Sequence, residues 1–151
     1  MYFLNQPAMS TTTLVASEII YGSCNCGRIV VSLPRSSLPS SVTICHCSNC
    51  RKSSGSLFAV NIATSMESIN IEGAAKFHVD IAASGNSVKQ YFCGACGSAI
   101  MNVVAIHPEQ CILKGGLFVT SGVRLPAPGR EQFWRNAEHW ERPFPGVTPI
   151  D

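Results

Sequence analysis

The sequence has few charged residues. Only 13% of its 151 residues are charged, about half of the usual share of roughly a quarter. So few cations leave no basic surface of the kind that binds nucleic acid. A small domain with few charges is also expected to hide apolar surface in a pocket or in a contact between copies of the chain, so a homo-oligomer is one expectation.

Long apolar stretches are missing as well. Residues 1–17 have neither the basic start and continuous apolar run of a signal peptide nor the length of a membrane helix. We therefore expect a flexible N-terminal extension over 1–17, no membrane partner and a cytoplasmic location. The rest is predicted to be one folded domain over 18–146 and a C-terminal tail over 147–151, because a chain of this length can bury one core.

No segment shows a long helical period. Short β-branched and aromatic runs alternate instead with glycine, proline, serine and asparagine turns. The predicted fold is a single mostly β domain of short antiparallel strands, with one short helical turn at 47–54 and another at 131–140. Strands are expected at 19–21, 28–33, 57–64, 68–72, 76–81, 87–92, 99–104 and 112–113.

Cysteine, in contrast, is plentiful and clustered. Seven of the 8 cysteines form three short motifs, Cys24-x-Cys26, Cys45-His46-Cys47-x-x-Cys50 and Cys93-Gly-Ala-Cys96. An extended Cys-x-Cys segment points both side chains to one face, and a Cys-x-x-Cys turn beside glycine folds its backbone over a metal ion. The chain is therefore expected to bind zinc. The eighth cysteine, Cys111, lies in an apolar run and is expected to be buried.

Seven thiolates suit two zinc ions of different kinds. A closed structural site takes four ligands, whereas a catalytic zinc takes three and keeps one position open. If the first and third motifs share an ion, that ion joins the beginning of the sheet-forming region to its end, and the middle motif remains for the second ion. The formal charge is +2, and two zinc ions on seven thiolates would bring it to about −1.

Three other arrangements use the same cysteines. Disulfides are disfavoured because these spacings bridge poorly and the sequence shows no secretory signal. A redox pair at Cys93 and Cys96 is disfavoured by the β-rich pattern and the other clusters. The serious rival is a closed second zinc site completed by His46. Local extension argues against it, because it turns His46 to the face opposite Cys45 and Cys47.

The three motifs also carry a resemblance to a known family. Segments 22–27, 45–56 and 92–98 resemble those of the glutathione-dependent formaldehyde-activating enzyme family, also called the Gfa-like or centromere protein V/GFA family, and the likeness extends over roughly 20–144. It implies an Mss4-like (β-tent) fold with two zinc ions per chain. The structural ion would be bound by Cys24, Cys26, Cys93 and Cys96, and the catalytic ion by Cys45, Cys47 and Cys50.

The same resemblance implies a reaction. The family's named activity joins glutathione to formaldehyde, so the chain is expected to be a zinc-dependent carbon–sulfur lyase or synthase, similar to S-(hydroxymethyl)glutathione synthase. Its partner would be glutathione, a related thiol or a glutathione-conjugated small molecule. The alternative is a zinc-stabilised Mss4-like binding module without catalysis. The three-cysteine motif argues against it, because a binding module needs only one structural zinc.

Residues beside the middle motif are candidates for binding the thiol. Arg51 and Lys52 are adjacent cations that could clamp the carboxylates of glutathione, with a solvated pair of charges as the other interpretation. Asn49 and Ser53 could add neutral hydrogen bonds. His46 is expected to be a positioned hydrogen-bond donor near the metal and a candidate for proton transfer.

Overall fold

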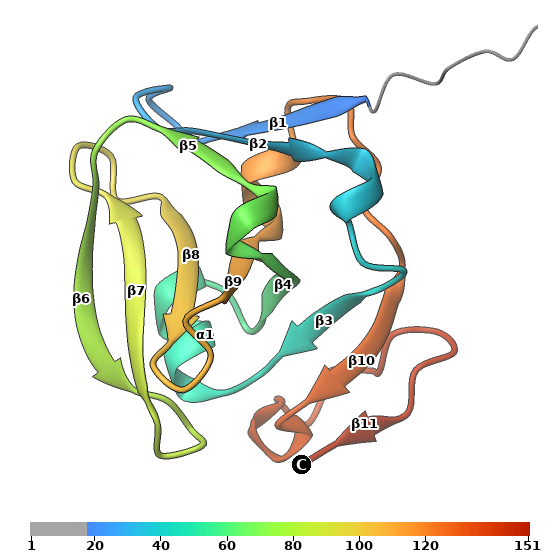
Figure 1. Cartoon of the computed structure of the whole chain (residues 1–151). Helices are drawn as coiled ribbons and strands as arrows, with labels where there is room; N and C mark the ends of the chain where they lie inside the picture. Colours follow the sequence, from blue (N-terminus) through green and yellow to red (C-terminus); the bar gives the residue numbers. More distant parts are fainter. Residues whose placement is uncertain (1–17) are drawn as a thin grey trace, which may run out of the picture.

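Two β-sheets make up most of the computed structural model, which describes residues 18–151. The extension predicted over 1–17 lies outside the described residues. The smaller sheet has the strand order β1-β2-β5, and Figure 1 shows it across the top of the view. Its antiparallel strands are β1 (Ile19–Ser23), β2 (Val30–Pro34) and β5 (Asn70–Glu72).

The larger sheet curls below the smaller one (Figure 1) and has the order β11-β10-β3-β4-β9-β8-β7-β6. Its neighbours are antiparallel, except that β10 runs parallel to both β3 and β11. The strands are β3 (Val42–Cys45), β4 (Ala59–Ser65), β6 (Ala75–Ile81), β7 (Ser87–Cys93), β8 (Ala99–Val104), β9 (Gln110–Lys114), β10 (Pro128–Gln132) and β11 (Pro149–Ile150).

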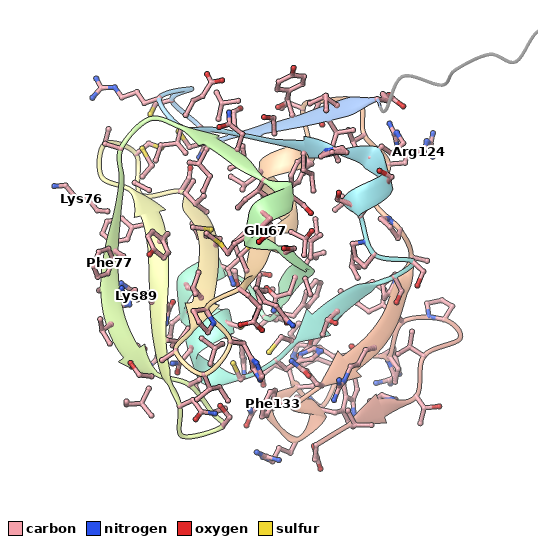
Figure 2. The ribbon with its side chains drawn as sticks, viewed as in Figure 1. Glu67, Lys76, Phe77, Lys89, Arg124 and Phe133 are labelled. Atoms are coloured by element: carbon pink, nitrogen blue, oxygen red, sulfur yellow. The ribbon has the colours of Figure 1, made fainter. Side chains whose placement is uncertain are left out.

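The main core lies between the two sheets. In β2, the side chains of Val31 and Leu33 are buried while their neighbours are half-buried, the alternation of a strand with one face inward. They belong to the same apolar cluster as Ile62, Ile100 and Leu113 of the larger sheet. On the outer face of the β6–β7 hairpin, Figure 2 shows side chains that project away from this core.

Helical structure is short. Within 18–151 the single α-helix is α1 (Ser48–Ser54). Cys47 is its N-cap and Gly55 its C-cap, and the φ of 62° at Gly55 stops the helix in the left-handed region. The helical turn predicted at 47–54 is therefore confirmed. The 3₁₀ turns are η1 (Arg35–Ser37), η2 (Met66–Ser68), η3 (Gly115–Phe118) and η4 (Trp134–Asn136).

The prediction of a mostly β domain is confirmed, but the helical turn expected at 131–140 is confined to three residues. Residues 131 and 132 end β10, and only the three-residue η4 follows. Parallel pairing with β3 holds this segment extended, and Phe133 then turns the chain with a φ of 59°. Strands β3 and β10 were not predicted, because both are short and their pairing partner is far away in the sequence.

The predicted C-terminal tail contains a short strand. Pro149 and Ile150 form β11, which pairs with β10 at one edge of the larger sheet. The domain limits stay a prediction. Within 18–151, no helix is both long and apolar enough to cross a membrane.

Candidate metal centres

The first group of sulfur atoms joins two turns that are distant in the sequence. Cys24 and Cys26 follow β1, while Cys93 ends β7 and Cys96 lies in the next turn. Their four Sγ atoms all lie within 4.8 Å of one another. Cys26 Sγ is 3.6 Å from Cys24 Sγ and 3.7 Å from Cys93 Sγ. The fold thus brings the first and third motifs together.

Backbone hydrogen bonds fix the shape of these turns. The Cys93 amide donates to the Ser98 carbonyl at 2.9 Å, and the Gly97 amide donates to the Cys93 carbonyl at 2.8 Å. Gly97 has a φ of 75°, which glycine adopts without steric cost. In the other turn, the Ile29 amide donates to Cys24 Sγ at 3.3 Å. Such a bond favours the thiolate that a metal ion requires.

Zinc fits this four-sulfur group by distance. Tetrahedral zinc–thiolate bonds of about 2.3 Å separate the sulfur atoms by roughly 3.8 Å, close to the 3.6 and 3.7 Å found here. All eight cysteines of the chain are free thiols, so none of these contacts is a disulfide.

The second group of sulfur atoms comes from one continuous segment. Cys45 ends β3, Cys47 caps α1 and Cys50 lies in the first turn of that helix. Their Sγ atoms also lie within 4.8 Å of one another, and Cys47 Sγ accepts a hydrogen bond from the Cys50 amide at 3.4 Å. The structure therefore gathers three thiols here, the number that leaves one position of a tetrahedral zinc open.

A cavity of about 280 Å³ opens onto this three-cysteine group. No lysine, arginine, histidine, aspartate or glutamate of the described residues lines it, so its polar lining apart from the three thiols is neutral. Amide side chains and an apolar wall contribute most of the remaining lining, namely Asn49, Asn61, Gln90, Asn102, Val88, Val104, Ile112 and Phe133. A cavity of this kind suits a small neutral molecule next to the sulfurs.

Phe133 packs against the three-cysteine group from the end of β10. Figure 2 labels it at the lower edge of the view, where β10 ends. Its φ of 59° is the one positive value at a non-glycine residue within 18–151. Bulky residues rarely adopt this conformation, and such backbone strain concentrates at functional sites.

A buried lysine lies behind the three-cysteine group. Lys114 ends β9 and is the cross-strand neighbour of Asn61 in β4. Its Nζ donates to Asn61 Oδ1 at 3.1 Å, and Asn61 Nδ2 donates to Cys50 Sγ at 3.7 Å. Burial lowers the pKa of Lys114 below its usual value, while the charges of the three thiolates, Cys50 first, act to raise it.

Hydrogen bonds and nearby charge give the thiols different pKa values. Bonds from Cys45 and Cys47 lower the pKa of Cys50, and the Lys114 charge adds to that effect. Bonds with Cys47 and Cys50 raise the pKa of Cys45. In the four-cysteine group, hydrogen bonds from Ser98 lower the pKa of Cys96 to about 5. Each group therefore has at least one thiol that ionises readily and can begin metal capture.

His46 is turned away from the sulfurs. Its Nε2 lies 2.9 Å from Glu131 Oε1, and its Nδ1 lies 3.7 Å from Glu141 Oε2. The imidazole packs edge-on against Trp134, with 5.1 Å between ring centroids. It does not line the cavity at the cysteines. The ring thus connects the cysteine segment to the C-terminal part of the chain.

The other predicted thiol-binding residues separate in space. Asn49 lines the cavity and donates to Asp80 Oδ2 at 2.9 Å. Ser53 lines two neighbouring cavities instead. Arg51 donates to Glu138 Oε1 at 2.7 Å and to the Asn136 carbonyl. Neither Arg51 nor Lys52 lines the cavity at the cysteines.

Lys114, Asn61 and Glu131 were not among the residues predicted for the site. One signal was available in the sequence, because Asn61 and Lys114 are polar residues within apolar β patterns. Such positions are buried only when they have partners. Their partners could not be identified, since the contact joins residues 53 apart in the sequence.

Comparisons with known proteins agree with this geometry. Residues 19–136 match the family model described as "Glutathione-dependent formaldehyde-activating enzyme". The chain is also similar to a crystal structure of a Rhodobacter sphaeroides protein, with 21% identity and a TM-score of 0.52, over 70% of this chain and 91% of that one. At this identity the likeness shows the fold alone. No curated protein matches the chain.

Proposed function

Because the chain belongs to the glutathione-dependent formaldehyde-activating enzyme family, we propose that it makes or breaks the carbon–sulfur bond between glutathione, or a related thiol, and a small electrophile such as formaldehyde. The observation that carries the proposal is the group of three thiols, Cys45, Cys47 and Cys50, on a cavity. A module with only a structural metal would need the four-cysteine group alone.

The two groups have separate roles in this proposal. Cys24, Cys26, Cys93 and Cys96 would bind a structural zinc that joins the turn after β1 to the turn after β7. Cys45, Cys47 and Cys50 would bind the catalytic zinc. When bound there, zinc would hold the substrate sulfur as a thiolate in the position that the protein leaves open.

The cavity's own residues orient the electrophile. The amides of Gln90 and Asn102 line it and can donate hydrogen bonds to a carbonyl or hydroxyl oxygen. Asn49 also lines it, but its Nδ2 already donates to Asp80 Oδ2 and to the Ile81 carbonyl. As the carbon–sulfur bond forms, the carbonyl π electrons move to that oxygen, which takes up a proton. Phe133 and the apolar wall limit the access of water to the forming bond.

Two roles expected from the sequence stay predictions. A proton-transfer role for His46 is supported by its position between two cysteines of the group, although its ring faces Glu131 and Glu141. Carboxylate binding by Arg51 and Lys52 is supported by their place directly after Cys50 on α1. The bond from Arg51 to Glu138 favours a role in supporting the loop.

The test is the rate at which glutathione and formaldehyde exchange with S-(hydroxymethyl)glutathione, measured by NMR on zinc-loaded protein. We expect wild-type protein to accelerate the exchange in proportion to its concentration. Cys50→Ser removes one of the three ligands and should abolish the acceleration, whereas Cys111→Ser, at a cysteine outside both groups, should retain it. If the exchange stays at its uncatalysed rate with wild-type protein, and other thiol conjugates give the same result, the binding-module interpretation remains.

A further inference from the structure

Lys114 is a buried cation without a carboxylate partner. Its side chain is 7% exposed, and none of the ion pairs formed within 18–151 includes it. Its hydrogen bonds go to neutral amides. Asn61 Oδ1 accepts at 3.1 Å, and Asn102, in the orientation that satisfies both ends of its amide, accepts at 3.2 Å. A buried ammonium group is unfavourable unless negative charge lies nearby.

The negative charge near Lys114 belongs to the three-cysteine group. Asn61 lies between the two, since one end of its amide accepts from Lys114 Nζ and the other donates to Cys50 Sγ. The cross-strand pairing of Asn61 with Lys114 keeps both side chains on one face of the larger sheet. The arrangement is therefore set by the sheet and does not depend on a flexible loop.

The two cysteine groups differ in how their charge can be balanced. Cys24 and Cys93 are buried, but Cys26 is exposed and Cys96 is partly exposed, so water reaches the four-cysteine group and screens its charge. Cys45, Cys47 and Cys50 are all buried. Their charge has to be compensated by the protein itself.

We propose that Lys114 is the counter-charge of the three-cysteine metal centre and that Asn61 is the positioning residue that transmits its effect to Cys50. A divalent ion on three thiolates carries a net charge of about −1, which one ammonium group brings to zero. Removal of either residue weakens metal binding at this centre and leaves the four-cysteine group unchanged.

This assignment also bears on the substrate, and that part rests on the proposed function. A thiol that joins the centre as a thiolate adds one more negative charge. With Lys114 in place the total is about −1, and without it about −2 in a buried site. Lys114 therefore favours a ligand that binds as an anionic sulfur over one that binds as a neutral carbonyl.

The experiment is a cobalt titration of the full chain, because absorption bands of cobalt bound to thiolate report both groups. Lys114→Met removes the charge and keeps the length of the side chain. We expect the affinity of the three-cysteine group to fall by about tenfold to a hundredfold, the usual effect of removing a partner of metal ligands. The affinity of the four-cysteine group should not change. Lys89→Met, at an exposed lysine on the outer face of β7 (Figure 2), is the matched control and should change neither.

Lys114→Met is informative only if it folds, and loss of the cobalt absorption of the four-cysteine group would reveal that it does not. A second variant covers that case. Asn61→Asp is nearly isosteric and places a carboxylate between Lys114 and Cys50, so it should weaken the three-cysteine group selectively. Three-cysteine affinity within twofold of wild type in a folded variant would overturn the assignment, as would a wild-type chain that binds one ion only. If the variants weaken metal binding by the three-cysteine group selectively but the wild-type chain has no exchange activity, only the proposed function is overturned.

Discussion

His46 Nε2 lies 2.9 Å from Glu131 Oε1, and both side chains are 1% exposed. This contact joins the cysteine segment after β3 to β10, across 85 residues of sequence. The second carboxylate oxygen, Glu131 Oε2, accepts from the Phe144 amide at 3.1 Å. One buried carboxylate therefore connects the segment that carries Cys45 and Cys47 with two C-terminal segments.

Removal of this carboxylate should be costly. Glu131→Ala leaves His46 and the Phe144 amide without their acceptor in a buried site, so we expect the free energy of unfolding to fall by about 3 kcal/mol or more. Urea unfolding at a fixed excess of zinc measures it. Glu109→Ala is the control, because the contact of Glu109 with His107 is exposed and should contribute less than about 1 kcal/mol. Equally small effects of both substitutions would show that the buried contact does not stabilise the fold.

Single cysteine substitutions should separate the two metal groups. Cys96→Ser opens the group that joins two distant turns, so the chain should lose much of its folded population. Cys50→Ser should leave a folded chain that lacks activity and binds one zinc ion. Circular dichroism and metal analysis on the same samples measure both results. A fully active Cys50→Ser chain would show that the three-cysteine group is not the catalytic one.

Substitution of Arg51 tests whether this cation beside the three-cysteine group binds the substrate carboxylates or supports the loop. Its guanidinium already bonds Glu138 and the Asn136 carbonyl, so we expect Arg51→Ala to slow the exchange of glutathione and of a small thiol without carboxylates by similar factors. Because the pair with Glu138 is partly exposed, the loss of stability should be no more than about 1 kcal/mol. An increase of tenfold or more in KM for glutathione alone would establish the carboxylate clamp instead.

The sequence predicted best those features whose residues lie close together along the chain. The three cysteine motifs could be interpreted directly because metal ligands two or three residues apart lie on one face or one turn. Strand β10 was missed, since its parallel pairing with β3 connects 128–132 with 42–45 and leaves no local pattern. The Lys114–Asn61 contact and the His46–Glu131 contact were missed for the same reason. Both depend on pairings that only the folded sheet creates.

Two metal ions with different roles are proposed to bind one chain, and stepwise removal of zinc tests this division most directly. A chelator titration should follow zinc content, exchange activity and circular dichroism on the same sample. We expect the first zinc to leave the three-thiolate group, because three thiolates and solvent bind less tightly than four thiolates. Activity should disappear with this first ion while the fold is retained, and the fold should be lost with the second. Full activity at one zinc per chain, or one cooperative loss of both ions with unfolding, would contradict the account.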